Sequence, residues 1–191
     1  AYIAHLHPLN SKATGLRTHG EAQFAIKGDQ LTIRVSVEDA PPGIAHWQHL
    51  HGFTDGKAAQ CASNTSSDAN HDGVVDLIET EAVSGTTLVP LNADPTAMKI
   101  ASNTYPKASV DGSYVYRETV SLKALQTAFA KAFKGRKLDL AKRVVYIHGV
   151  PSGTKLPATA KSLNGVPVDV TLPIACGVIT PALRNPAAPG S

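Results

Sequence analysis

Apolar and polar residues alternate along several short stretches of the chain, most clearly from residue 30 to residue 38. Four apolar residues there are separated by single polar ones: Leu31, Ile33, Val35 and Val37. Because successive side chains of a strand point to opposite faces, this period of two predicts a half-buried antiparallel strand. Residues 21–26 form a matching run, joined to it by Lys27-Gly28-Asp29, which predicts a hairpin.

Other short runs rich in β-branched and aromatic residues are bounded by turn residues. They predict strands over residues 2–9, 44–51, 86–91, 114–120, 144–148, 166–172 and 175–179. One stretch instead has apolar residues at helical spacing: Leu122, Leu125, Phe129 and Phe133. It starts at Ser121, a good N-cap, and ends before Gly135, so we expect one helix over residues 121–134 in a mainly β chain.

The composition fits a single folded domain. The chain has 191 residues, of which 42% are apolar and 17% are charged, and this is enough to bury a sizeable core. We expect one domain over residues 1–180 and a disordered tail over residues 181–191. The net charge of +3 is modest and no run of 18 apolar residues occurs, so we expect neither nucleic-acid binding nor membrane insertion.

Two observations bear on where the protein works. The sequence opens at Ala1 rather than Met, as a secreted protein does after its signal peptide is removed, although a recombinant boundary would look the same. Cys61 and Cys176 are an even count in a chain that looks exported, which favours one disulfide over two buried thiols. We therefore expect a secreted or periplasmic protein.

Residues 68–79 carry oxygen ligands at the spacing of an EF-hand-type calcium loop. Five side chains and one backbone carbonyl, that of the valine, fill the ligand positions: Asp68, Asn70, Asp72, Val74, Asp76 and Glu79. Gly73 stands where such a loop turns sharply. Asp, Asn and Gly are also ordinary turn residues, so a polar surface turn is the alternative. Because every ligand position is filled, we predict bound calcium.

Three of the eight histidines fall within residues 46–51. On a strand, His49 and His51 project to the same face, which supplies half of a transition-metal site. His148, at the end of another predicted strand, is the best candidate for a third ligand. The alternatives are surface histidines, or core histidines bonded to backbone carbonyls. His5 and His7 also alternate on one strand face, either as a second metal pair or as surface residues.

Three segments together resemble copper/zinc superoxide dismutases. They are His49-Leu50-His51-Gly52 with Cys61 soon after, the stretch from Arg143 to His148, and Ala175-Cys176-Gly177-Val178-Ile179. In that family an H-x-H pair and a later strand-borne histidine bind copper, and two cysteines in these places form a disulfide. The resemblance implies copper, or zinc, at His49, His51 and His148, and a Cys61–Cys176 disulfide. It also implies a Greek-key β-sandwich or flattened barrel.

The chain more closely resembles bacterial secreted proteins with a chordin-type (CHRD) domain. That likeness covers roughly residues 4–178 and includes the start at Leu6 to Asn10, the hairpin at Gly28 to Thr32, the H-x-x-H-x-H-G segment and the Asp-Gly-Val-Val of the acidic loop. It agrees with a secreted, superoxide dismutase-related fold.

The departures from the dismutase pattern are equally informative. The zinc-site histidines have no counterpart after His51, so calcium is expected to organise the long loop in place of zinc. Pro173 stands where the family has its active-site arginine, which puts electrostatic guidance of an anionic substrate in doubt. His46 is extra, and is a fourth ligand, a partner behind the ligands, or a proton donor.

Three functions are therefore open. The first is a calcium-stabilised, copper-binding protein with redox activity in the manner of the dismutases. The second is a metal carrier or scavenger that uses the same histidines without catalysis. The third is a calcium-stabilised structural or interaction module without a transition metal. The sequence contains neither G-x-S-x-G nor H-E-x-x-H, so hydrolases rank low.

Overall fold

The computed structural model describes residues 1–182, and its strands belong to one curled sheet. The strand order is β5-β4-β7-β8-β1-β2-β3-β6, with β9 paired to β1. The strand bounds are β1 Tyr2–Pro8, β2 His19–Lys27, β3 Gln30–Glu38, β4 Gln48–Gly52, β5 Thr86–Pro90, β6 Tyr114–Ser121, β7 Val144–His148, β8 Pro173–Val178 and β9 Thr180–Pro181. Neighbouring strands pair antiparallel throughout the sheet.

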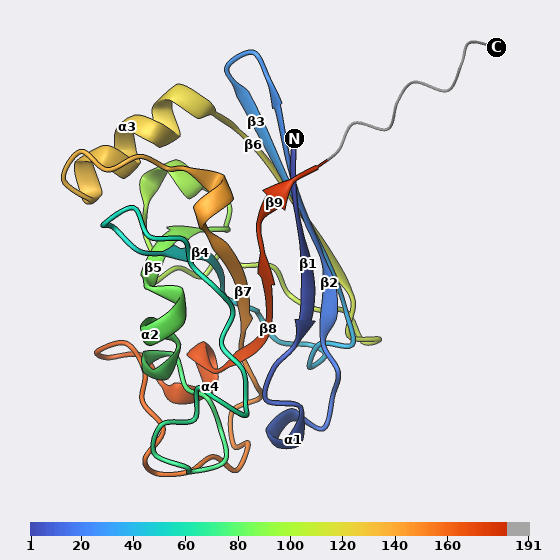
Figure 1. Cartoon of the computed structure of the whole chain (residues 1–191). Coiled ribbons are helices and arrows are strands. Elements are labelled where there is room, and N and C mark those ends of the chain that lie inside the picture. Colours follow the sequence, from blue (N-terminus) through green and yellow to red (C-terminus); the bar gives the residue numbers. More distant parts are fainter. Residues whose placement is uncertain (183–191) are drawn as a thin grey trace, which may run out of the picture.

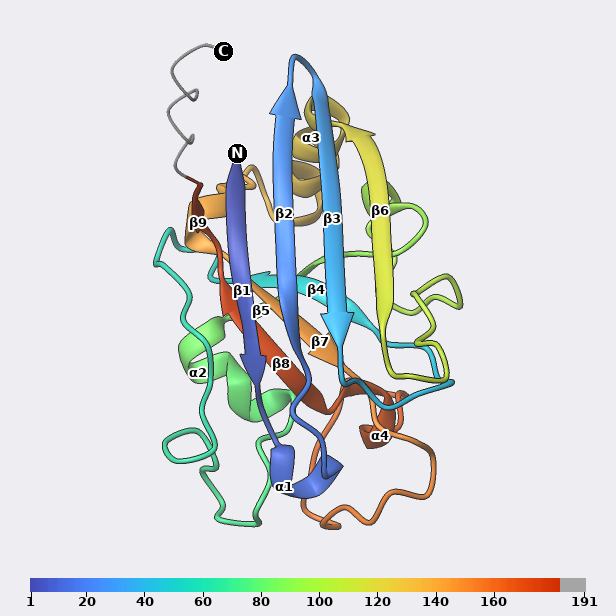
Figure 2. The ribbon, with the colours of Figure 1, turned by 90° about the vertical axis from the view of Figure 1, so that its right-hand side faces the viewer.

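The sheet curls over into two layers that face each other (Figure 1). β1, β2, β3 and β6 form the first layer, and β5, β4, β7 and β8 form the second. The end of β1 pairs with β8 and so joins the layers. Figure 2 shows the long strands of the first layer crossing the shorter strands of the second. Within residues 1–182 no pairing joins β5 to β6, so the barrel is open at that edge. The predicted all-β, flattened-barrel fold is confirmed in this half-open form.

Alternation along the strands fills the space between the layers. The four apolar residues of β3 are all buried, and the polar residues between them are not. Leu50 of β4 and Val145 and Ile147 of β7 point into the same core from the second layer. The residues that alternate with them must then point to the outer face of that layer, yet they too are buried: His49, His51, Val144, Tyr146 and His148. Something outside the sheet covers them.

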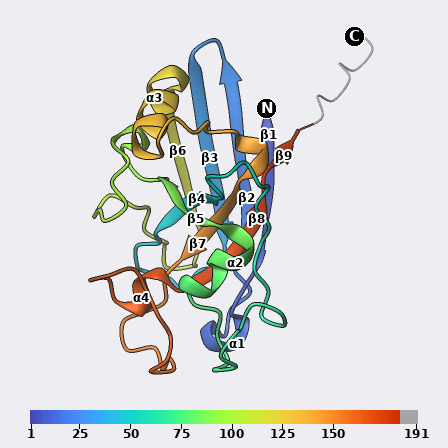
Figure 3. The same cartoon turned by 60° about the vertical axis from the view of Figure 1, so that its left-hand side comes forward.

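The outer cover of the second layer is made by two long connections. In the connection over residues 53–85, Ala59, Ala62 and Val75 pack against Val144 and Tyr146 of β7. Figure 3 brings this face forward and shows α2, which belongs to that connection, lying over β7 and β8. The connection over residues 91–113 covers this face beside His49 of β4, which Tyr105 contacts. These covers create a second, smaller buried region outside the main core.

The predicted helix over residues 121–134 is confirmed as α3, Leu122–Ala132. Ser121 is its N-cap, because its Oγ accepts a hydrogen bond from the Ala124 N–H at 3.1 Å. Leu125 and Phe129 are fully buried, as the helical spacing predicted. Gly135 follows the helix with φ +80° and donates its N–H to the Ala130 carbonyl at 2.7 Å.

Several single helical turns were not predicted from the sequence, because each is too short to show a helical period. They are α1 Ser11–Thr14, η1 Ile78–Thr80, α2 Glu81–Ser84, η2 Pro95–Ala97, η3 Leu140–Lys142 and α4 Val168–Thr171. The prediction of a strand over residues 166–172 is wrong, because α4 occupies its centre. Pro167 lies inside that stretch and cannot donate to a sheet ladder, so the alternating valines close a helical turn instead.

The C-terminal prediction is tested only at its start. Pro181, placed in the disordered tail by the sequence, pairs with Tyr2 of β1. The rest of that prediction, for residues 183–191, lies outside the described residues. Within residues 1–182 no helix is long and apolar enough to cross a membrane.

Candidate metal centre

β4 and β7 lie side by side in the second layer and carry histidines on its outer face. Leu50 points into the core, so His49 and His51 on either side of it point outward. The register places His49 opposite Tyr146, and His148 follows two residues later on the same face of β7. Register shifts beside His51 and beside His148 add local bends, which re-aim side chains. Sheet geometry therefore brings together histidines that are about a hundred residues apart in sequence.

The rings of His49, His51 and His148, here called the triad, face a common point. The ring centroids are 5.0 Å apart for His49 and His148, 5.5 Å for His51 and His148, and 5.8 Å for His49 and His51. One nitrogen of each ring lies within 4.8 Å of the other two. Metal–nitrogen bonds of about 2 Å place three ligand atoms about 3.5 Å apart, so small ring rotations complete the coordination.

Four ring nitrogens of the triad are buried without a hydrogen-bond partner among the described residues: His49 Nδ1, His51 Nδ1, His51 Nε2 and His148 Nε2. Buried polar atoms are normally hydrogen-bonded, because each one left unpaired costs about 1–3 kcal/mol. His148 Nδ1 is held differently, since it donates to the Trp47 carbonyl at 3.1 Å and so leaves the Nε2 lone pair free. The residues present therefore fit a metal ion that prefers imidazole ligands.

Burial keeps the three imidazoles uncharged. It lowers the pKa of His148 from 6.5 to about 4. Burial, reinforced by repulsion from the neighbouring rings, lowers the pKa of His49 and of His51 well below 6.5. At neutral pH the triad is therefore in the neutral form, which is the form that coordinates a metal.

His46 lies next to the triad but does not join it. Its Nδ1 is 2.9 Å from the His148 carbonyl oxygen and its Nε2 is 2.9 Å from the Pro41 carbonyl oxygen. Its ring stacks on Tyr114 with a centroid separation of 5.8 Å. Of the three roles open for His46, this position suits a partner behind the ligands, because each nitrogen faces a backbone carbonyl oxygen and one of those carbonyls belongs to His148.

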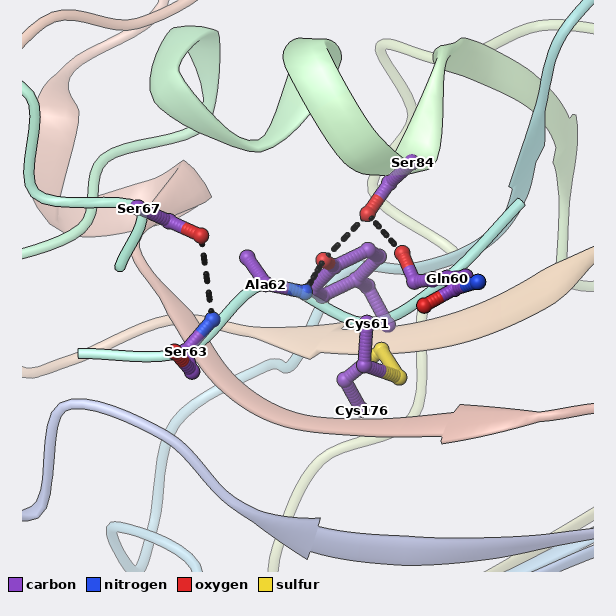
Figure 4. The surroundings of a disulfide bond; sticks show 8 residues. Gln60, Cys61, Ala62, Ser63, Ser67, Ser84 and Cys176 are labelled. Carbon is purple, nitrogen blue, oxygen red and sulfur yellow. Dashed lines mark hydrogen bonds between the residues drawn. A yellow bond between two sulfur atoms is a disulfide. The ribbon is translucent and has the colours of Figure 1, made fainter. Parts of the chain in front are cut away.

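The disulfide between Cys61 and Cys176 is present, with Cα atoms 5.9 Å apart and a sequence separation of 115. The predicted pairing is confirmed, and the alternative of two buried thiols is wrong. Figure 4 shows the bond beneath the 53–85 connection, which it fastens to β8. This link holds the outer cover against the face that carries the triad.

Tyr146 ties the same cover to the triad itself. Its hydroxyl accepts a hydrogen bond from the Ala62 N–H at 2.9 Å and lies 2.6 Å from Ser84 Oγ. Its ring centroid is 4.7 Å from that of His51. The alternation along β7 already placed Tyr146 on the face of His148, so this neighbour was within reach of sequence reasoning, although the prediction did not include it.

The acidic residues 68–79 form a tight loop within the 53–85 connection. Asp68, Asp72 and Glu79 each bring one carboxylate oxygen within 4.8 Å of the other two. Gly73 has φ +94°, which is the left-handed turn expected at the sixth loop position. Val75 is completely buried and anchors the loop below the turn. Three of the predicted calcium ligands thus lie close together in the structure.

All the side chains predicted to bind calcium also have partners within the protein, and the three clustered carboxylates accept backbone N–H groups of the loop. Asn70 donates its side-chain amide to Asp72 Oδ2 at 3.2 Å. Asp76 exchanges hydrogen bonds with the Glu79 backbone and side chain at 2.9 and 3.1 Å, which is a capping box at the start of η1. The side chain of Val74 is buried in the core. Residues 64–66 before the loop form a turn, so only the exit side is helical, whereas an EF-hand has a helix on each side of its loop.

Two residues that hold the site together were missed by sequence reasoning. Asn10 receives the Val75 N–H at 2.8 Å and donates to the Val75 carbonyl at 2.8 Å, so it ties the acidic loop to the end of β1. The Tyr105 hydroxyl oxygen lies 2.8 Å from His49 Nε2. Neither has a sequence signal, because both contacts join segments far apart in the chain. His5 and His7 are exposed on β1 beside the disulfide, away from the triad.

No protein-family model matches the chain, and no curated protein matches it in sequence. Among solved structures it is similar to a mutant of a SOD-like protein from Bacillus subtilis, at 16% identity over 93% of this chain and 98% of that chain, with a TM-score of 0.46. The SOD-like protein from Bacillus subtilis itself is 14% identical over 93% of this chain and 98% of that chain, with a TM-score of 0.45. Cu/Zn superoxide dismutase from Brucella abortus is 16% identical over 93% of this chain and 99% of that chain, with a TM-score of 0.42. These neighbours are superoxide dismutase-like proteins, but identities and TM-scores this low carry no argument about metal or activity.

Proposed function

We propose that the chain is a copper-binding protein whose metal is held by His49, His51 and His148. The observation that carries this proposal is the set of buried triad nitrogens with no hydrogen-bond partner within residues 1–182. Neutral imidazoles bind both copper and zinc, and nitrogen sites bind copper more tightly than zinc, so copper is the first choice. When bound, copper supplies one-electron redox chemistry.

The surrounding residues orient the ligands and keep water out. His49, His51 and His148 are only 2%, 1% and 1% exposed. The Trp47 carbonyl fixes the ring of His148, and the Tyr105 hydroxyl contacts the ring of His49. A site this closed favours tight retention of the metal over rapid exchange of small ligands with solvent.

The same proposal includes an oxidising location outside the cytoplasm. The disulfide supports it, because such bonds persist mainly in secreted and periplasmic proteins. The triad is buried, and the residue at the start of β8 is the uncharged Pro173. Both features favour copper binding with slow redox turnover over fast superoxide dismutation.

We predict that the copper-loaded protein dismutes superoxide far below the diffusion limit of about 10⁸–10⁹ M⁻¹s⁻¹. The ligands are covered and no cation replaces the family's arginine at Pro173, so anions are neither admitted nor guided quickly. Stopped-flow decay of superoxide measures the rate, with His148→Ala as the control that lacks a ligand. A wild-type rate near the diffusion limit would contradict the closed site.

We further propose that calcium binds the acidic loop through Asp68, Asp72 and Glu79, with Asn70, Asp76 and the Val74 carbonyl completing the shell. The proximity of three carboxylates supports this, since unscreened carboxylates repel one another. Thr159 donates to Asp72 at 2.8 Å, so the 157–161 segment is positioned by the same loop. Calcium would then stiffen the outer cover of the triad.

Calcium removal is expected to lower the melting temperature. A ligand present at a hundred times its Kd stabilises the folded state by about 2.7 kcal/mol. Differential scanning calorimetry with calcium and with excess chelator measures the shift, and Glu79→Gln should show little of it. Asp55→Asn is the matched control, because Asp55 also accepts a backbone N–H in an exposed loop but lies outside the acidic segment. Equal melting temperatures with and without calcium would contradict the proposal.

A further inference from the structure

Tyr105 lies on the 91–113 connection, outside the sheet, and its hydroxyl reaches the triad. The hydroxyl oxygen is 2.8 Å from His49 Nε2 and 2.6 Å from the Ile100 carbonyl oxygen. A carbonyl oxygen only accepts hydrogen bonds, so the hydroxyl hydrogen is donated to Ile100. The remaining contact can only be satisfied if His49 Nε2 carries a hydrogen and donates it to the hydroxyl oxygen.

This hydrogen-bond chain determines which nitrogen of His49 is free. A neutral imidazole has one N–H, so a hydrogen on Nε2 leaves the lone pair on Nδ1. His49 Nδ1 is one of the buried nitrogens without a partner. The donor to Tyr105 and the candidate ligand atom are therefore the two different nitrogens of the same ring.

Aromatic packing holds the Tyr105 hydroxyl in this place. The Tyr105 ring stacks on Trp47 with centroids 5.2 Å apart and planes 24° apart. Both rings meet His49 edge-on, Tyr105 at 5.4 Å and Trp47 at 6.2 Å. Tyr105 is 5% exposed, so it also closes the triad on the side of the 91–113 connection.

We propose that Tyr105 is a positioning residue of the metal centre, which holds His49 as the Nε2–H tautomer so that Nδ1 binds the metal. The role rests on the proposed metal-binding function and adds a residue of the 91–113 connection to the site. Groups that hydrogen-bond to a metal-binding histidine typically change metal affinity about 10–100-fold when removed.

The test removes one hydroxyl. Tyr105→Phe keeps the ring and is expected to weaken binding of Zn²⁺ and of Cu²⁺ about 10–100-fold in competition with a chelator of known affinity. The matched control is Tyr116→Phe. The Tyr116 hydroxyl also donates to a backbone carbonyl of the same connection, that of Asn92 at 2.7 Å, but touches no histidine. Equal affinities for wild type and Tyr105→Phe would overturn the proposal, as would an equal loss in both variants.

A second measurement needs neither metal nor variant. Nitrogen-15 NMR of the metal-free wild type is expected to show His49 protonated at Nε2. His49 protonated at Nδ1, in a protein that does bind metal, would overturn the role of Tyr105 and leave the proposed function standing. A wild type that takes up no metal would remove the proposed function and this role with it. The two failures are therefore distinguishable.

Discussion

Replacing His51 by leucine is expected to abolish transition-metal binding and, in the same step, to make the metal-free protein more stable. Both ring nitrogens of His51 are buried and have no hydrogen-bond partner in the described part of the chain. Each costs about 1–3 kcal/mol of unfolding free energy, and a leucine of similar volume removes both. The metal would recover that cost in the native site, which is why a metal-binding protein tolerates it. Urea unfolding of the metal-free variant, together with its metal content, measures both effects.

His46→Leu is the matched control for this experiment. His46 is as buried as His51, but its nitrogens contact two backbone carbonyl oxygens. A neutral imidazole donates its one N–H to one of these carbonyls, so His46→Leu removes that hydrogen bond and is expected to destabilise the metal-free protein. If His51→Leu destabilised it to the same extent, His51 would be an ordinary core residue and the unpaired nitrogens would carry no functional meaning.

Reduction of the disulfide is expected to lower the unfolding free energy by about 5 kcal/mol. In the chain-entropy model the stabilisation grows with the length of the closed loop, and the Cys61–Cys176 link spans 115 residues. Within the described residues every cysteine is in this bond, so a reductant has one target. The measurement is the urea midpoint of the metal-free protein with and without a phosphine reductant.

A double variant, Cys61→Ala with Cys176→Ala, should reproduce the effect of reduction without any reductant. The 53–85 connection would then be held to the sheet mainly by apolar packing and by hydrogen bonds such as that from the Ala62 N–H to Tyr146. A double variant as stable as the wild type would show that the link adds nothing to the fold.

The parts of this fold that were predictable from sequence are those governed by local periodicity. The alternation in residues 30–38 and the N-cap at Ser121 both depend on neighbours in the chain, and both predictions are confirmed in β3 and α3. Local periodicity can also mislead. Val168 and Val170 alternate as in a strand, but Pro167 prevents strand pairing, so the strand predicted over 166–172 is wrong.

The candidate site was predictable only in part. The face shared by His49 and His51 follows from strand geometry, and His148 followed from strand ends and from the family resemblance. Tyr105 did not, because its contact to His49 joins positions 56 residues apart through an irregular connection. The position of His46 behind the triad likewise depends on the carbonyl of Pro41, which no spacing reveals.

The acidic loop shows the same limit. Its spacing nominated six ligands, but the capping box between Asp76 and Glu79 meets the same D-x-x-E pattern with backbone hydrogen bonds. A sequence motif cannot separate these two uses of one carboxylate, whereas melting with and without calcium can.

The most direct test of the central claim is the metal content of the untagged protein after incubation with copper and removal of free ions. Elemental analysis should find one copper per chain in the wild type and none in His51→Leu. A wild type without stoichiometric copper or zinc would mean that three buried imidazoles share one point for no metal, and would leave only a disulfide-linked β domain.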